Sequence, residues 1–113
     1  MNYLHQDLAA GRWHELTFFE QMGNIGSEVG RARKWQHKNQ KLFEGAFARA
    51  HELLTLTIAD KRWMNSLGEL CRVKEALCDA YCGGPLYNSD FASLEKYFNH
   101  FAMAAQRRKE NKS

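Results

Sequence analysis

The sequence predicts an all-α protein, folded as an up-down antiparallel four-helix bundle in a single domain (residues 1–113). Three observations predict this class. Pro85 is the only proline among 113 residues, whereas small strand-rich domains need many turns. Apolar residues recur with the helical period of about 3.6 residues in four long segments. The 44% apolar and 26% charged residues, with a net charge of +3, are typical of a folded domain rather than a disordered chain.

The first long segment runs from Phe18 to Gln36. Thr17 precedes it and Glu20 follows three residues later, which predicts a capping box at the helix N-terminus. Its core-facing stripe consists of Phe18, Met22, Ile25, Val29 and Ala32. A short amphipathic helical piece over residues 3–10, closed by Gly11, is expected to precede this segment.

A second stripe on the same segment combines one aromatic residue with three glycines: Phe19, Gly23, Gly26 and Gly30. A glycine inside a helix costs about 1 kcal/mol relative to alanine. We therefore expect another backbone to approach this stripe closely, and we assign the stripe to an interface between copies of the chain. The alternative is that the glycines break the helix near residues 23–26.

The second segment runs from Asn39 to Ile58. Its core face consists of Phe43, Ala46, Phe47, Ala50, Leu53, Leu54, Thr57 and Ile58. Asp60 is the expected N-cap of the third segment, which runs from Trp63 to Cys82 and ends at residues 83–85, Gly-Gly-Pro. The third core face consists of Trp63, Leu67, Leu70, Cys71, Leu77, Cys78 and Tyr81.

The fourth segment runs from Phe91 to Arg107, with Ser89 or Asp90 as its N-cap. Its core face consists of Phe91, Leu94, Phe98, Phe101, Ala102 and Ala105. The basic tail that follows (107–113) is expected to fray. Four segments of about 30 Å joined by short links predict the up-down arrangement.

Three cysteines, Cys71, Cys78 and Cys82, lie close together on the third segment. No Cys-x-x-Cys pair and no facing Glu-x-x-His motif accompanies them, so we interpret them as reduced, apolar residues and expect no metal and no cofactor. Lys74, on the same face, is interpreted as a snorkelling side chain or as the ion-pair partner of an acid such as Glu28.

Membrane insertion and export are both excluded by the sequence pattern. No run approaches the ~20 apolar residues of a transmembrane helix. The N-terminus lacks the basic region and apolar stretch of a signal peptide. The sequence therefore predicts a cytoplasmic protein without a membrane partner.

The most informative charged feature is a basic cluster between the first two segments. Five cations and no acid lie within residues 31–41, with an indole and an imidazole between them. The cluster consists of Arg31, Arg33, Lys34, Trp35, His37, Lys38 and Lys41. Such local density is typical of phosphate-backbone binding, and the two rings offer stacking surfaces for bases. The alternative is a solvated charged turn. The tail cations Arg107, Arg108 and Lys109 are expected to extend the cluster if the bundle brings them near.

An enzymatic alternative uses part of the same cluster. Arg31 and His37 have the spacing found in helix-bundle ribonucleases of the HEPN type. Ala32 stands where a polar residue usually follows the arginine, so the match is partial. No other pattern of nucleophile, base and acid is visible, and we assign no catalytic residues in the preferred interpretation.

Apolar residues outside the core stripes favour self-association. A single small core does not need Leu56, Tyr97 and Met103 in addition to the glycine stripe, and exposed apolar patches usually mark interfaces. We therefore predict a homo-oligomer whose interface includes these residues. Association would also multiply a weak basic surface into a polyvalent one. A protein scaffold that binds only proteins is a further alternative.

The order of the segments resembles a known family. The residues that carry the likeness are QMGNIGSEVGRARKW from Gln21 to Trp35, then LFEGAFARAHELLTLTIAD, LCRVKEALCDAY and SLEKYFNHF. Over about residues 15–106 the chain resembles the bacterial four-helix-bundle proteins encoded in intervening sequences of 23S rRNA genes, and their relatives, the accessory variability determinants of diversity-generating retroelements. The likeness rests on helix order, helix length and a first helix that contains glycine.

The resemblance implies a function as well as a fold. Proteins of this family form ring-like pentamers with a basic surface, and the retroelement members bind a reverse transcriptase and nucleic acid. They carry no catalytic residues. We therefore expect a non-enzymatic, self-associating accessory protein that binds RNA, DNA or both and assists a reverse transcriptase.

Overall fold

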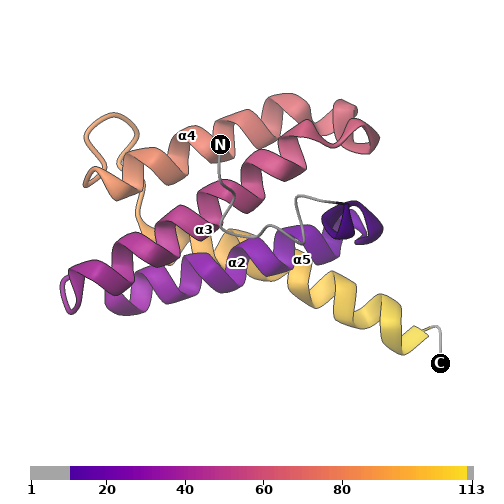
Figure 1. Cartoon of the computed structure of the whole chain (residues 1–113), viewed down its shortest axis with the longest axis horizontal. Helices are drawn as coiled ribbons and strands as arrows, with labels where there is room; N and C mark the ends of the chain where they lie inside the picture. Colours follow the sequence, from indigo (N-terminus) through magenta and orange to yellow (C-terminus); the bar gives the residue numbers. More distant parts are fainter. Residues whose placement is uncertain (1–10, 112–113) are drawn as a thin grey trace.

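The chain forms four α-helices that pack against one another around one hydrophobic core (Figure 1). The structure is a computed structural model that describes the backbone of residues 11–111 and the side chains of residues 11–107. The predicted helical piece over residues 3–10 lies outside the described residues. The elements are the 3-10 helix η1 (Arg12–Glu15), α2 (Phe18–Trp35), α3 (Gln40–Ala59), the 3-10 helix η2 (Lys61–Ser66), α4 (Leu67–Tyr81) and α5 (Phe91–Asn111). The predicted all-α bundle is confirmed.

Helix α2 begins at the predicted capping box. The Thr17 hydroxyl accepts a hydrogen bond from the Glu20 backbone N–H at 3.1 Å, and the Glu20 carboxylate accepts one from the Thr17 N–H at 2.9 Å. The helix continues without a break through residues 23–26. Of its predicted core stripe, Phe18 is partly buried and the others are fully buried: Met22, Ile25, Val29 and Ala32.

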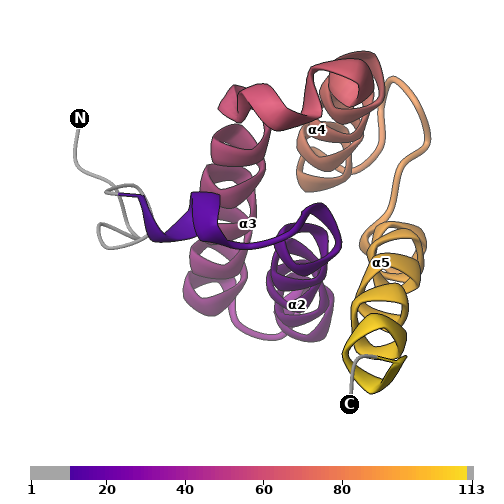
Figure 2. The same cartoon turned by 90° about the vertical axis from the view of Figure 1, so that its right-hand side faces the viewer.

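The glycine stripe of α2 is the surface on which α5 packs. A Cβ atom added at Gly26 would lie 2.6 Å from the Phe98 Cβ, and one added at Gly23 would lie 3.3 Å from the Ala102 Cα. The predicted close approach of a second backbone is therefore correct, but the backbone belongs to α5 of the same chain. Figure 2 shows α2 between α3 and α5.

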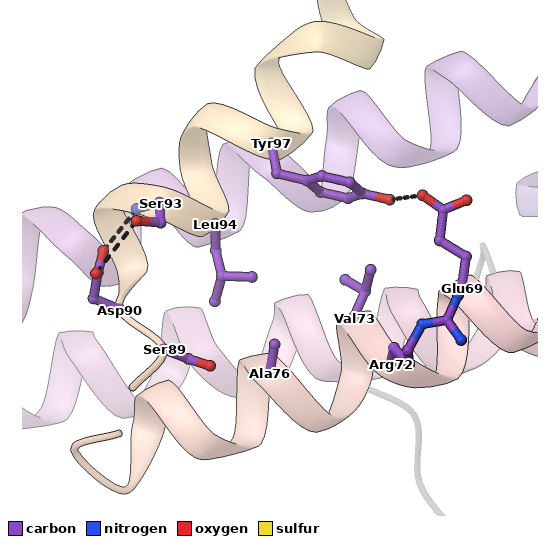
Figure 3. Close-up of a pocket in the computed structure, with 9 residues that line it drawn as sticks. All are labelled: Glu69, Arg72, Val73, Ala76, Ser89, Asp90, Ser93, Leu94 and Tyr97. Carbon is purple, nitrogen blue, oxygen red and sulfur yellow. Dashed lines mark hydrogen bonds between the residues drawn. The ribbon is translucent and has the colours of Figure 1, made fainter. Parts of the chain in front are cut away.

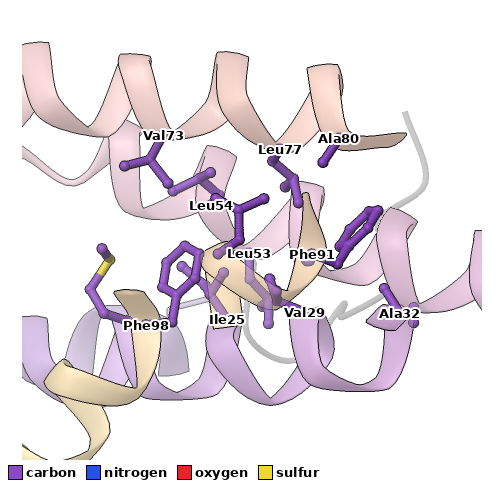
Figure 4. Close-up of a cluster of buried hydrophobic side chains, with 14 of the residues drawn as sticks. Ile25, Val29, Ala32, Leu53, Leu54, Val73, Leu77, Ala80, Phe91 and Phe98 are labelled. Carbon is purple, nitrogen blue, oxygen red and sulfur yellow. The ribbon is translucent and has the colours of Figure 1, made fainter. Parts of the chain in front are cut away.

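Stacked aromatic rings join the start of α3 to the end of α4. The Tyr81 ring stacks on Phe47 at 4.1 Å and on Phe43 at 5.5 Å between centroids. The Phe43 ring also meets Phe91, the first residue of α5, edge to face. Figure 4 shows the cluster of buried apolar side chains to which α2, α3, α4 and α5 all contribute.

The third helix begins later than predicted and presents a different face. Residues 61–66 form η2, with a kink at Trp63, and α4 begins only at Leu67. Because a 3-10 helix has about 3 residues per turn, this segment shifts the phase of the apolar pattern. The buried face consists of Leu70, Val73, Leu77 and Ala80, whereas Leu67 is 41% exposed and Cys71 is exposed.

A buried polar network fixes the junction between α3 and η2. The Gln21 amide donates to the Asp60 carboxylate at 3.2 Å and accepts from the Trp63 indole at 2.9 Å. Arg62 also donates to Asp60, at 2.7 Å. The hydrogen bonds from Arg62 hold the pKa of Asp60 far below its ordinary value. Asp60 caps η2 by accepting from the Arg62 N–H, as predicted for the following helix.

The nine residues between α4 and α5 (82–90) form a loop organised by Asp79. Gly83 and Gly84 end α4 with φ values of 96° and 80°, which favour glycine. The buried Asp79 carboxylate accepts hydrogen bonds from three backbone N–H groups of the loop. Asp90 then caps α5 by accepting from the Ser93 N–H at 2.7 Å. Sequence reasoning identified the glycines and the cap but missed Asp79.

The C-terminal segment differs from the prediction. Helix α5 continues to Asn111, so residues 107–111 are helical rather than frayed. Helices α2 and α5 run antiparallel, because Gly23 of α2 faces Ala102 of α5 whereas Gly30, farther along α2, faces Glu95, which comes earlier in α5. Among residues 11–111, no helix combines the length and the apolar character that crossing a bilayer requires.

Candidate functional site

The basic cluster lies at one end of the bundle, around the turn between α2 and α3. The turn is tight because the backbone N–H groups of Lys38 and Asn39 both donate to the Trp35 carbonyl at 2.9 Å. His37 adopts a left-handed conformation, with φ of 67°. This turn brings the last residues of α2 and the first residues of α3 to one surface, which we call the basic end.

Two arginines of the cluster form ion pairs within the bundle. The Arg31 guanidinium binds the Glu28 carboxylate at 2.5 Å, and Arg49 binds the other Glu28 oxygen at 2.9 Å. Arg33 binds Glu95 of α5 at 2.6 Å. Both Arg31 and Arg33 remain exposed on their outer sides, so they still contribute charge to the surface.

Lys74 does not pair with Glu28, because the two carboxylate oxygens of Glu28 already bind Arg31 and Arg49. Lys74 lies near His51 instead. There, burial and, to a smaller extent, the charge of Lys74 lower the histidine pKa. The interpretation of Lys74 as the partner of Glu28 was therefore wrong.

Three lysines of the basic end are exposed: Lys34, Lys38 and Lys41. Among the described residues, none of them has a carboxylate within ion-pair distance. The Lys34 ammonium lies 5.0 Å from the centroid of the Trp35 ring. The Trp35 side chain itself is partly buried against the core. The basic end thus presents three exposed lysine side chains around one turn.

The tail cations do not join this surface. Gly30 faces Glu95 and Gly23 faces Ala102, so α5 runs away from the basic end. At 1.5 Å per residue, Arg107 lies about 18 Å farther along α5 than Glu95. The C-terminus accordingly lies at the opposite end of the molecule in Figure 1. Arg107 is exposed there, and Arg108 and Lys109 follow it in the same helix. The bundle therefore does not bring these three residues near the cluster, so the condition for their extending it is not met.

The residues predicted to form an interface fall into two groups. Gly23, Gly26 and Gly30 face α5, and Leu56 is only 8% exposed within the core. Gly26 and Leu56 are therefore not available to a second copy, whereas Gly23 and Gly30 are only partly buried. The others are at least partly accessible: Phe19, which packs on Phe18 and Phe101, Tyr97, which is partly buried, and Met103, which is 55% exposed.

The two residues of the ribonuclease alternative are both exposed at the basic end. Arg31 is held by Glu28, and His37 lies in the turn. Within the described part of the chain, no hydrogen bond or ion pair joins them.

The cysteines are less buried than predicted. Cys71 and Cys82 are exposed, and Cys78 is partly buried, which raises the pKa of its thiol. All three are free thiols. Over residues 11–107, no three side chains of His, Cys, Asp or Glu are grouped as a metal site requires.

Sequence reasoning missed a cleft between α4 and α5. The cleft has a volume of about 340 Å³, and Figure 3 shows its lining. Val73 and Ala76 of α4 face Leu94 of α5 across it. The Tyr97 hydroxyl donates to the Glu69 carboxylate at 2.7 Å and closes one end. Burial and this hydrogen bond raise the pKa of Tyr97 above its ordinary value.

The cleft exists because α4 and α5 are joined by a loop rather than a tight turn. Asp79 fixes this loop, and α5 packs mainly on α2 through the glycine stripe. The two helices therefore make far fewer contacts with each other than α5 makes with α2. The apolar periodicity of α4 and α5 places their side chains on inward faces but carries no information on this separation.

Comparison with protein-family models gives no match, and neither the curated proteins nor the solved structures give a significant one.

Proposed function

We propose that this chain is a non-enzymatic, self-associating protein that binds the phosphate backbone of RNA or DNA at its basic end. One observation carries the proposal: Lys34, Lys38 and Lys41 surround a single turn, and no acid of the described chain neutralises them. Lysines in this state bind phosphates as point charges and release condensed counterions from the nucleic acid.

Phosphate binding at the basic end does not require a large net charge on the whole chain, because the lysines are concentrated around one turn. The chain carries a net charge of only +3, but the ion pairs of Arg31 and Arg33 fix the surface on which the lysines stand. A single copy would bind weakly, because three phosphate contacts give little affinity at physiological salt. Self-association through exposed apolar side chains such as Met103 would present several basic ends to one nucleic acid. The partner that the family resemblance implies is a reverse transcriptase.

A salt titration tests the proposal. Binding of a labelled single-stranded and a labelled double-stranded oligonucleotide is measured by anisotropy at several salt concentrations. Three phosphate contacts per chain predict that log K falls with log salt with a slope of about −2 for the single strand and about −3 for the duplex. Replacing Lys34, Lys38 and Lys41 by Gln should remove most of this slope and most of the low-salt affinity.

The matched control removes the same charge elsewhere. Arg12, Lys61 and Lys96 are exposed, and the triple change to Gln at these positions leaves the basic end intact. This control should bind almost as the wild type does. If both triple variants lose affinity equally, binding depends only on net charge and the proposed site is wrong. Absence of binding at low salt would overturn the function itself.

A further inference from the structure

The cleft between α4 and α5 has the shape and chemistry of a docking groove for another helix. Its floor is apolar, formed by Val73, Ala76 and Leu94, and polar side chains stand only at its rim. None of these residues is used by the basic end, so the cleft is a separate feature of the molecule.

The dimensions of the cleft fit a short stretch of helix. Along α5 it extends from Asp90 to Tyr97, which is two helical turns or about 10 Å. Both of its walls are helices whose backbone groups bond within the helix, so they offer no free edge to an extended strand. A helix satisfies its own backbone groups and presents an apolar stripe at positions i, i+3 or i+4, and i+7. Such a stripe spans the same two turns.

The charge around the cleft selects the kind of helix. Asp90 stands at one end of the lining and Glu69 at the other. Arg72 is the only cation of the lining, against these two acids. The lining therefore has one more acid than cation, on a chain whose net charge is positive. A partner with cations at each end of its apolar stripe matches this pattern.

We propose that the α4–α5 cleft docks a basic amphipathic helix of a protein partner. Two apolar turns of that helix seat on Val73, Ala76 and Leu94, and its flanking Lys or Arg side chains reach Glu69 and Asp90. The cleft then acts as a protein-binding site on the face of the bundle, distinct from the basic end.

The test uses a synthetic helical peptide of about 15 residues with a Leu stripe over two turns and Lys at both ends of the stripe. One control peptide carries Glu in place of each Lys, and another has the same composition in scrambled order. We expect the full-length chain to bind the Lys peptide at least about tenfold more tightly than either control in anisotropy measurements at low salt. Equal binding of all three peptides would overturn the proposal, as would no binding of the Lys peptide.

Two sets of variants locate the binding. Ala76→Trp fills the floor of the cleft and should reduce affinity for the Lys peptide at least about tenfold, whereas Ala92→Trp, on an exposed part of α5 outside the lining, should leave it unchanged. If Ala76→Trp does not fold, Glu69→Gln keeps the apolar floor, removes the acid at one end of the cleft and should weaken binding and its salt dependence.

Two results would overturn this assignment. Undiminished peptide binding by Ala76→Trp, or by the Gln variant if the Trp variant does not fold, would show that the peptide does not use the cleft. The oligomeric state of each variant is measured by light scattering at the same time. If the wild type is an oligomer that Ala76→Trp converts to a monomer, the occupant of the cleft is a second copy of this chain.

Discussion

Replacing Gly26 by alanine tests the packing of α5 on α2, which determines where the basic end and the C-terminus lie. The new methyl group would stand 2.6 Å from the Phe98 Cβ. Phe98 is fully buried, and its Cβ cannot move without its backbone. Inserting a methyl group into a packed core costs about 1–3 kcal/mol. Alanine regains about 1 kcal/mol of helix propensity, and because Phe98 has no room we expect a net loss of about 1–2 kcal/mol.

Gly68 provides the matched control on another helix. Nothing lies within 4 Å of a Cβ added at Gly68, which is exposed in the first turn of α4. Gly68→Ala should therefore stabilise the chain by up to about 1 kcal/mol through helix propensity alone. The stability of Gly30→Ala should lie between those of Gly26→Ala and Gly68→Ala, since the new methyl group meets only the flexible Glu95 carboxylate.

The assay is thermal and urea unfolding followed by circular dichroism. For a chain of this length, 1 kcal/mol corresponds to roughly 4 °C in Tm. Gly26→Ala should thus lower Tm by about 4–8 °C while Gly68→Ala raises it slightly. If Gly26→Ala is as stable as Gly68→Ala, then α5 does not pack on the glycine stripe, and the placement of the C-terminus opposite the basic end fails with it.

Three further predictions concern caps, carboxylates and the turn at the basic end. Thr17→Ala removes the capping box and should cost about 1 kcal/mol in urea unfolding, whereas Thr17→Ser should cost much less. Stability should fall as pH drops below about 4, because the folded pKa values of Asp60 and Asp79 lie below their unfolded values. For Asp60 the main cause is its hydrogen bonds to Arg62; for Asp79 burial opposes the shift and the three loop N–H groups outweigh it. Their contribution is complete above the unfolded pKa and is lost as pH falls through the folded one; urea unfolding at pH 6 and pH 3 measures it, and Asp79→Asn should reduce the difference. His37→Gly relieves a left-handed conformation and should leave stability unchanged or raise it by up to about 1 kcal/mol; labelled RNA cleaved by the wild type but not by this variant would favour the ribonuclease alternative.

Local chemistry was predictable wherever a few neighbouring residues decide the structure. The capping box at Thr17, the glycine-rich end of α4 and the Asp90 cap each depend on residues within one turn, and all are present as predicted. The four helices were also predictable, because their apolar periodicity persists over about four turns or more. The start of the third helix was not, because the kink at Trp63 depends on hydrogen bonds to Gln21, far away in sequence.

The surroundings of the basic end could not be predicted, because they depend on contacts between residues that are far apart in the sequence. The cluster at residues 31–41 was visible as a run of cations, but the pairing of Arg33 with Glu95 depends on which helix lies beside α2. The same helix order placed Arg107 at the opposite end of the molecule. The glycine stripe correctly predicted a close backbone contact, yet nothing in its pattern distinguishes α5 of the same chain from a second copy. The α4–α5 cleft follows from a loop anchored by Asp79, which had no visible motif.

An NMR titration with a short oligonucleotide at low salt tests the proposed function most directly, because it reports each backbone amide separately. The largest chemical-shift changes should occur at residues 31–41, around Lys34, Lys38 and Lys41, and should disappear as salt is raised. The chemical shifts of residues 100–107 should change little, because α5 runs away from the basic end and Arg107 lies about 18 Å beyond Glu95 along the helix. Absence of shifts, or largest shifts in the C-terminal half of α5, would contradict the assignment of nucleic-acid binding to the basic end.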